Sequence, residues 1–169
     1  MQLKLVQPSE ELRPLVTDMM DEWTATGEKI VPYAIRKADY HDYEAWLQAV
    51  LSTGVSPGHV PDTTFLCLDQ EQNILVGAVN IRHRLNDQLL LNGGHIGDGV
   101  RPSQRRKGVA TQMIALALEE CRKLGISRVL MVCDKTNIGS AKSIQRNGGV
   151  LENEVLVDGV TEQRYWIDL

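Results

Sequence analysis

The sequence predicts an α/β fold in which helices cover both faces of a mixed sheet of about seven strands. Three observations support this prediction. Apolar residues recur at helical spacing in some segments and alternate or form short runs in others, and 169 residues suffice for one core, so a single domain over residues 1–169 is expected. The second half reads strand, helix, strand, helix, strand, which indicates a parallel pair with right-handed crossovers. Polar turns elsewhere indicate hairpins, so the rest of the sheet is expected to be antiparallel.

The first part of the chain is expected to form one strand, two helices and a loop. Polar and apolar residues alternate over residues 2–6, as in a half-buried strand. Apolar residues recur at helical spacing after Pro14 and again after Asp39, which is a suitable N-cap, so two helices are expected with irregular residues 28–38 between them. Residues 52–62 are rich in turn formers, which predicts a mobile loop.

Three strands are expected after this loop. Residues 63–68 and 74–82 are strand-like and joined by a polar turn, which predicts an antiparallel hairpin. A longer strand is expected over residues 89–100, interrupted by glycines that mark a bulge or the close approach of another backbone or a ligand. A tight hairpin beginning at Asn92-Gly93 would explain two of them. The glycines are Gly93, Gly94, Gly97 and Gly99.

The last part of the chain alternates helices and strands. Two strands flank Asp158-Gly159, which is a strong hairpin signal. The expected elements are a helix from Gly108 to Leu124, a strand over 127–133, a helix over 138–147, and strands over 150–157 and 160–167.

A short basic turn separates an apolar strand that ends at Val100 from a helix that begins at Gly108. The first N–H groups of a helix have no intrahelical partners and carry partial positive charge, so this junction suits an anion. Gly108 and Ala110 lack bulk and let a ligand approach the backbone, while the basic residues add full charges. A diphosphate fits this arrangement best; the alternative is a plain helix start with solvated charges.

The run Arg105-Arg106-Lys107-Gly108-Val109-Ala110, together with the strand before it and the strand, Asn, helix and Gly-Gly turn after it, resembles the signature of the GNAT family of N-acetyltransferases. The preceding glycine-rich run resembles a bacterial branch of predicted acetyltransferases in that family. The resemblance implies acetyl-CoA as co-substrate, with its pyrophosphate on the backbone of residues 106–111 and its thioester carbonyl polarised at the Val100 backbone. The cofactor-binding residues implied here are Val100, Arg105, Arg106, Lys107, Gly108, Val109, Ala110 and Thr111.

The resemblance also implies that the acetyl group passes directly to an amine of a small molecule or a protein. Asn137 lies where the family has an Asn that holds the pantetheine amide, and Ser140 could assist; Asn is also a good helix cap, and the two roles are compatible. Many members have a Tyr as proton donor where this chain has Ile144, which cannot donate. Another donor or water must then act, or the chain is a non-catalytic acyl-CoA-binding module.

Two titratable residues of the glycine-rich strand are candidate general bases, His95 and Asp98. Their spacing places them on opposite faces of a regular strand unless a bulge intervenes. The ordinary pKa of His suits proton acceptance near neutral pH, and Asp98 lies closer to the carbonyl-binding end. The structural alternatives are a sheet-surface histidine and an aspartate that binds the backbone; proton loss through water would need neither.

Composition narrows the class of protein. A formal net charge of −4 argues against nucleic acid as the main partner. The three cysteines lack C-x-x-C spacing and the histidines lack metal-ligand spacing, so no disulfide and no metal is expected, and a reducing, cytoplasmic location follows. No apolar run approaches the roughly 20 residues of a membrane span, and no signal peptide is evident. The last hairpin leaves an edge strand through which a homodimer could form.

Overall fold

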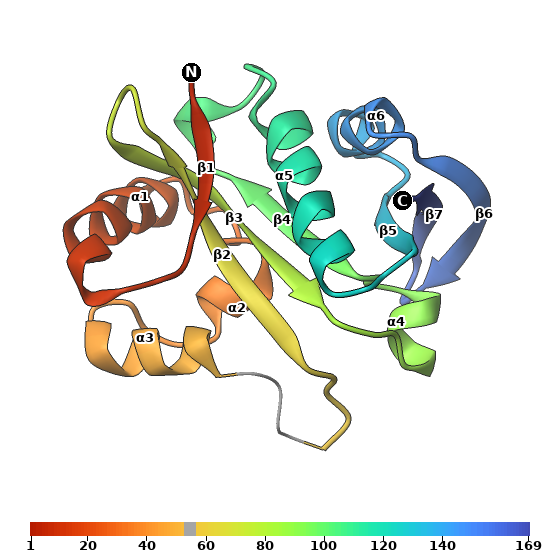
Figure 1. Cartoon of the computed structure of the whole chain (residues 1–169), viewed down its shortest axis with the longest axis horizontal. Helices are drawn as coiled ribbons and strands as arrows, with labels where there is room; N and C mark the ends of the chain where they lie inside the picture. The colour runs from red at the N-terminus through yellow and green to blue at the C-terminus, as the bar shows by residue number, and fades with distance from the viewer. Residues whose placement is uncertain (53–56) are drawn as a thin grey trace.

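A computed structural model describes residues 1–52 and 57–169, and its strands form two antiparallel sheets (Figure 1). The larger sheet has the order β1-β2-β3-β4 and the smaller one the order β5-β7-β6. Residues 53–56 of the loop predicted over 52–62 lie outside the described residues. The strands are β1 (Leu3–Val6), β2 (Asp62–Asp69), β3 (Ile74–Arg82), β4 (Ile96–Val100), β5 (Arg128–Asp134), β6 (Val150–Val157) and β7 (Val160–Asp168).

Helices cover both faces of the larger sheet (Figure 1). Leu66 and Cys67 are neighbours on β2 and point to opposite faces, so each enters a different buried cluster. One cluster contains Trp23 and Trp46 from α1 and α3, and the other contains Met113 from α5. No helix in the described part of the chain combines the length and apolar character needed to cross a membrane. The α-helices are α1 (Arg13–Ala25), α2 (Tyr33–Arg36), α3 (Tyr43–Leu51), α4 (Asp87–Leu91), α5 (Val109–Lys123) and α6 (Ile138–Arg146).

The α/β class and the mainly antiparallel pairing are confirmed, but the strands do not form one sheet with a parallel pair. Near the start of β4, an isolated bridge joins Gly94 to Met131, and the His95 N–H donates to the Leu130 carbonyl at 2.8 Å. Beyond this contact β4 and β5 belong to different sheets. Among the described residues, the far edge of β4 therefore has no strand partner, and its outward N–H groups are available to a ligand.

Three local predictions are corrected. The strand predicted over 89–100 begins only at Ile96, because Asn86 caps helix α4 by accepting a hydrogen bond from the Leu89 N–H at 2.9 Å. The irregular stretch 28–38 contains the short helix α2. Helix α3 is capped by Asp42, whose side chain accepts from the Ala45 N–H, rather than by Asp39.

Gly99 in β4 and Gly94 just before it allow other parts of the backbone to pass close by. A Cβ on Gly99 would lie 1.9 Å from the carbonyl oxygen of Val31, and one on Gly94 would lie 2.4 Å from that of Leu130. Of the explanations considered for these glycines, the approach of another backbone is therefore the one observed at these two positions. Asn92 ends helix α4, so the alternative of a tight hairpin beginning at Asn92-Gly93 is wrong. The connection between α1 and α2 consequently lies directly on β4.

A buried arginine ties α1 to the segment that follows β4. Arg101 donates from Nη2 to Asp18 at 2.8 Å and from Nε to Glu22 at 2.9 Å. Glu22 also accepts from the backbone N–H and the hydroxyl of Ser103, at 3.0 and 2.9 Å, and its pKa is lowered despite the opposing effect of burial. This network fixes the start of the basic turn relative to α1.

Candidate active site

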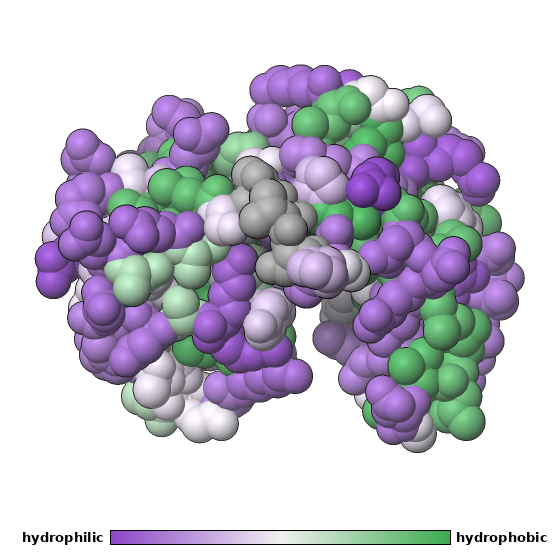
Figure 2. Space-filling model, turned by 90° about the horizontal axis from the view of Figure 1, so that it is seen from below, coloured by the Kyte–Doolittle hydropathy of each residue, from purple (hydrophilic) through white to green (hydrophobic). Residues whose placement is uncertain are grey.

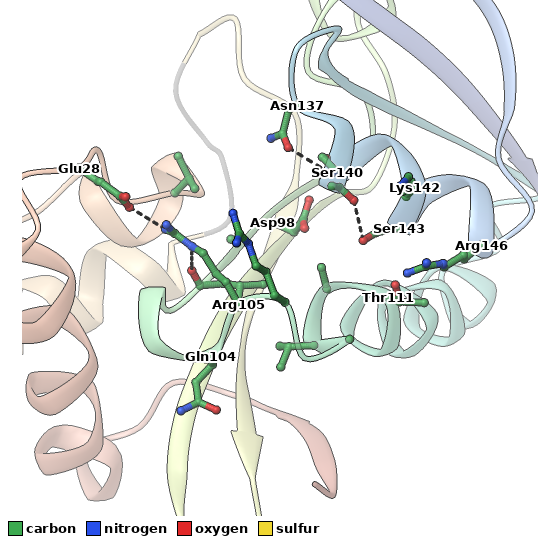
Figure 3. Close-up of a pocket in the computed structure, with 18 residues that line it drawn as sticks. Glu28, Asp98, Gln104, Arg105, Thr111, Asn137, Ser140, Lys142, Ser143 and Arg146 are labelled. Atoms are coloured by element: carbon green, nitrogen blue, oxygen red, sulfur yellow. Dashed lines mark hydrogen bonds and ion pairs between the residues drawn. The ribbon is translucent and has the colours of Figure 1, made fainter.

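A cleft of about 730 Å³ lies where β4 and the starts of α5 and α6 converge (Figure 3). Glu28 and Val31 line it from the connection between α1 and α2. Figure 2 shows a hollow between the two halves of the molecule. Because the two sheets separate beyond the start of β4, the cleft is bordered by backbone as well as by side chains.

The start of α5 exposes unpaired backbone donors to this cleft. The first intrahelical bond runs from the Gln112 N–H to the Gly108 carbonyl, so the three N–H groups between these residues have no intrahelical acceptor. Gly108 is left-handed at φ +82°, Arg106 at φ +62°, and a Cβ on Gly108 would meet no atom within 4 Å. Turns of this kind form concave anion sites. Every residue predicted for this turn except Lys107 lines the cleft.

Val100 presents its peptide group to the same cleft. The N–H groups of Arg101 and Arg82 donate to β3 and to the His95 carbonyl, respectively, and hydrogen-bonded pairs alternate along an antiparallel ladder. The N–H and C=O of Val100 therefore point away from β3, toward the open edge. The carbonyl accepts from Arg105 Nε at 3.1 Å, and the N–H remains directed at the cleft.

Arg105 is held by the protein rather than free in the cleft. Its Nη2 lies 2.8 Å from Glu28, and its guanidinium lies 5.9 Å from the centre of the Trp23 ring. The hydrogen bond from Arg105 lowers the pKa of Glu28. Glu28 thus offsets much of the positive charge of Arg105, which was predicted to bind an anion. The backbone N–H groups therefore contribute more to anion binding than predicted.

Asn137 caps α6, and Ser140 lies beside it in the cleft. The Asn137 side-chain oxygen accepts from the Ser140 N–H at 3.1 Å, which is the capping alternative, and its amide nitrogen lies on the side away from that bond (Figure 3). The nitrogen is therefore able to donate to a ligand as well. Ile144 is fully buried in the core and offers no proton.

The two candidate bases have different surroundings. His95 is buried outside the cleft lining, and its Nδ1 accepts from the Leu130 N–H at 2.9 Å, so the neutral ring carries its proton on Nε2. Burial, and then the charge of Arg82, lowers the pKa of His95 to about 4. This arrangement uses the only lone pair of the ring for structure and favours the alternative of a structural histidine.

Asp98 lines the cleft and is half-buried. Within the described part of the chain, no hydrogen bond or ion pair holds its carboxylate. Burial raises the pKa of Asp98 to about 6. A carboxylate with such a pKa is ionised at neutral pH and still able to accept a proton.

Several lining residues were not predicted from the sequence. Lys142 and Arg146 lie one turn apart on α6 and face the cleft, and no ion pair holds either one among the described residues (Figure 3). The two basic residues are four positions apart in the helix that Asn137 caps, so they lie on one face of it. This spacing is a signal that could have identified them. Ser143 also lines the cleft, but its hydroxyl donates to the Gly139 carbonyl at 3.0 Å.

Comparisons with known proteins fit this geometry. RimL, a ribosomal alpha-N-protein acetyltransferase in complex with coenzyme A, is 17% identical with a TM-score of 0.70, covering 99% of this chain and 94% of that chain. A chimera of the spermidine N-acetyltransferase SpeG from Vibrio cholerae and hSSAT is 16% identical with a TM-score of 0.65 (99% and 96%). The microcin self-immunity acetyltransferase MccE, in complex with acetyl-CoA and AMP, is 14% identical with a TM-score of 0.68 (99% and 93%). No curated protein matches the chain.

These likenesses identify the fold as that of the N-acetyltransferases. The family model described as "Acetyltransferase (GNAT) domain" matches residues 3–150. The chain therefore belongs to the GNAT family of acetyltransferases, as its basic turn predicted.

Proposed function

We propose that this chain transfers the acetyl group of acetyl-CoA directly to an amine of a small molecule or a protein. The observation that carries the proposal is the convergence of three sets of free donors on one cleft: the start of α5, the Val100 N–H and the Asn137 amide. Acetyl-CoA is a long anionic thioester with amides along its arm, so it needs donors of these kinds.

The residues present fit the phosphates of acetyl-CoA. The N–H groups at the start of α5 would bind the diphosphate, and the open space at Gly108 lets it approach the backbone. Lys142 and Arg146, with Arg106 across the cleft, would bind the remaining phosphate on the ribose. When bound, acetyl-CoA supplies the activated acetyl group.

The Val100 N–H and the Asn137 amide would orient the arm and the thioester. The Val100 N–H lies at the open edge of β4, where it can donate to the thioester carbonyl oxygen as negative charge develops there. One such donor contributes about 3 kcal/mol to lowering the barrier in comparable sites. The Asn137 amide nitrogen would donate to the pantetheine arm while its oxygen caps α6.

Asp98 is the residue we assign as general base, in preference to His95. Its carboxylate is unpartnered among the described residues and faces the cleft, whereas the His95 lone pair already accepts from Leu130. Asp98 would take the proton of the attacking amine, directly or through water. Ser140 offers a hydroxyl in the cleft where Ile144 cannot donate, and we propose that it or a water protonates the leaving thiolate.

Calorimetric titration with acetyl-CoA, followed by an assay of thiol release with a panel of amines, tests the proposal. Saturable binding and amine-dependent release of free thiol are expected. Binding without thiol release for any amine would support the non-catalytic acyl-CoA-binding module, which the buried Ile144 favours. Absence of binding would exclude both functions.

The pair Lys142 and Arg146 predicts discrimination between coenzyme A and dephospho-coenzyme A. Replacing both residues by Gln should weaken coenzyme A about tenfold, because two charged contacts to one phosphate are removed, and should change the affinity for dephospho-coenzyme A little. Titration of both ligands measures the ratio. Lys123→Gln, at the far end of α5, is the control for loss of a surface charge. Equal weakening of both ligands would contradict the assignment.

We also propose a cytoplasmic location and a homodimer joined through β6. All three cysteines are buried and unpaired, which supports a reducing compartment. Strand β6 lies at the edge of its sheet, and its Val150 and Leu156 are 70% and 73% exposed. Edge strands of this kind pair readily.

Light scattering tests the homodimer. The measured mass should be twice that of the chain, and Leu156→Lys should shift the measured mass toward that of the monomer. A monomeric wild type would contradict the dimer.

A further inference from the structure

Arg82 lies behind the open edge of β4, on the side of the larger sheet opposite α5. Its neighbour Ile81 enters the cluster packed on α5, so the Arg82 side chain points to the other face. The guanidinium packs on Gly97, where a Cβ would lie 3.3 Å from Nη2 and 3.4 Å from the Cβ of Pro32. Val31, the residue before Pro32, lines the cleft. Arg82 is therefore adjacent to the cleft but is not engaged by the groups proposed to hold acetyl-CoA.

The charge of Arg82 lacks a carboxylate partner. Its Nη1 donates to the carbonyls of Gly93 and Gly94 at 3.1 and 3.3 Å, whereas Nε and Nη2 have no acceptor among the described residues. Asp62, which faces Arg82 across the ladder, accepts instead from Asn80 at 2.6 Å and makes no ion pair with Arg82. Residues 53–56, which the structure does not describe, include no Asp or Glu.

In the described part of the chain, the two fully buried arginines are paired with acids, whereas the half-buried Arg82 is not. Arg101 contacts Asp18 and Glu22, and Arg164 contacts Glu152. Partial removal of a guanidinium from water without an anion is unfavourable. Burial lowers the pKa of Arg82, and the nearby charge of Asp62 acts in the opposite direction. The free Nε and Nη2 lie on one edge of the guanidinium, which is the edge that binds a carboxylate with two parallel hydrogen bonds.

We propose that Arg82 binds a carboxylate of the acceptor, so that the acceptor is a small amine that also carries a carboxylate, such as an amino acid. The inference rests on the proposed function and adds the substrate class to it. A guanidinium at this position disfavours polyamines, because it repels a second cation. The carboxylate would be held at Arg82 while the amine reaches the open edge of β4, beyond which the Asp98 side chain lies on the opposite face from Arg82.

Initial rates of acetyl-CoA-dependent thiol release with matched acceptor pairs test this proposal. Each pair consists of an amino acid and its α-carboxamide, which differ only in the group that Arg82 would bind. The wild type should favour the acids about tenfold or more in kcat/KM. Arg82→Gln should bring the acids down to the level of the amides and leave the amides and the Kd of acetyl-CoA unchanged. Arg82→Lys should retain part of the preference, because it keeps the charge without the fork.

Arg84→Gln is the matched control, because it removes the same charge two residues away at an exposed position. It should leave the preference intact. Equal kcat/KM for acids and amides in the wild type would overturn the proposal. An equal loss of kcat/KM for both members of each pair in Arg82→Gln would also overturn it. In either case thiol release continues, so only this inference fails and the proposed function stands. Absence of acetyl-CoA binding would overturn the proposed function as well.

Discussion

Replacing Asp98 by Asn should lower kcat about 100-fold or more while acetyl-CoA binds as in the wild type. Asn keeps the shape of the side chain but cannot accept a proton from the amine. In the wild type kcat should rise with pH as Asp98 ionises, with a midpoint near its pKa of about 6. The variant should lose this rise. A pH profile of kcat, with the Kd of acetyl-CoA measured beside it, checks both parts of the prediction.

His95→Gln provides the contrast. The Gln side chain can still accept from the Leu130 N–H, and the pKa of about 4 places the titration of His95 well below the predicted midpoint. This variant should be somewhat less stable but should keep the rise of kcat near pH 6. If the rise disappears in His95→Gln and persists in Asp98→Asn, the assignment of the base is wrong.

The same substitution of Asp98 should stabilise the fold at neutral pH. Burial raises the pKa of Asp98 from 3.8 to about 6, so between these values the folded chain binds more protons than the unfolded one. The contribution of Asp98 to stability is therefore most favourable below about pH 4 and is lost as pH rises through about 6. Asn carries no charge to desolvate, and Asp98→Asn should raise the free energy of unfolding at pH 7 by about 1–2 kcal/mol. Denaturant titrations at pH 4 and pH 7 measure the difference, which should be smaller at pH 4.

The parts of the site that the sequence predicted depend on local chain geometry. A glycine that must be left-handed at the start of a helix, an Asn that caps the next helix, and an apolar strand between them are all encoded within a few residues. Gly108 and Asn137 occupy those roles, and both line the same cleft. The hairpin at Asp158-Gly159 is likewise local, and it joins β6 to β7 as predicted.

The parts that the sequence did not predict depend on contacts between distant segments. Strands β4 and β5 belong to different sheets. Where two such strands stop pairing depends on the packing of both sheets, and no residue spacing in the sequence marks that point. The sequence predicts Arg105 as an anion ligand, but in the structure it pairs with Glu28 from the other side of the cleft. The ordinary pKa of histidine suggests His95 as a general base. In the structure its Nδ1 instead accepts a hydrogen bond from a backbone N–H thirty-five residues away in the chain. Helix α4 was missed because a run of leucines is equally compatible with a strand.

Gly108→Glu should abolish acetyl-CoA binding, with a loss of affinity of 100-fold or more by calorimetry (about 3 kcal/mol). The substitution puts a negative charge and bulk into open space at the start of α5, where the diphosphate is proposed to bind. Gly108→Gln has the same shape and the same backbone strain without the charge, and it should weaken binding only about tenfold. The difference between the two variants isolates the electrostatic part of phosphate recognition.

Gly125→Glu separates backbone strain from ligand contact. Gly125 follows the other end of α5 at φ +79°, close to the +82° of Gly108, and a Cβ there also meets no atom within 4 Å. Each Glu should destabilise the fold by about 1–2 kcal/mol, because a side chain at positive φ is strained. Only Gly108→Glu should affect binding. Since the two glycines flank one helix, equal loss of affinity in both variants would mean that the stability of α5, and not the anion site at its start, controls the binding of acetyl-CoA.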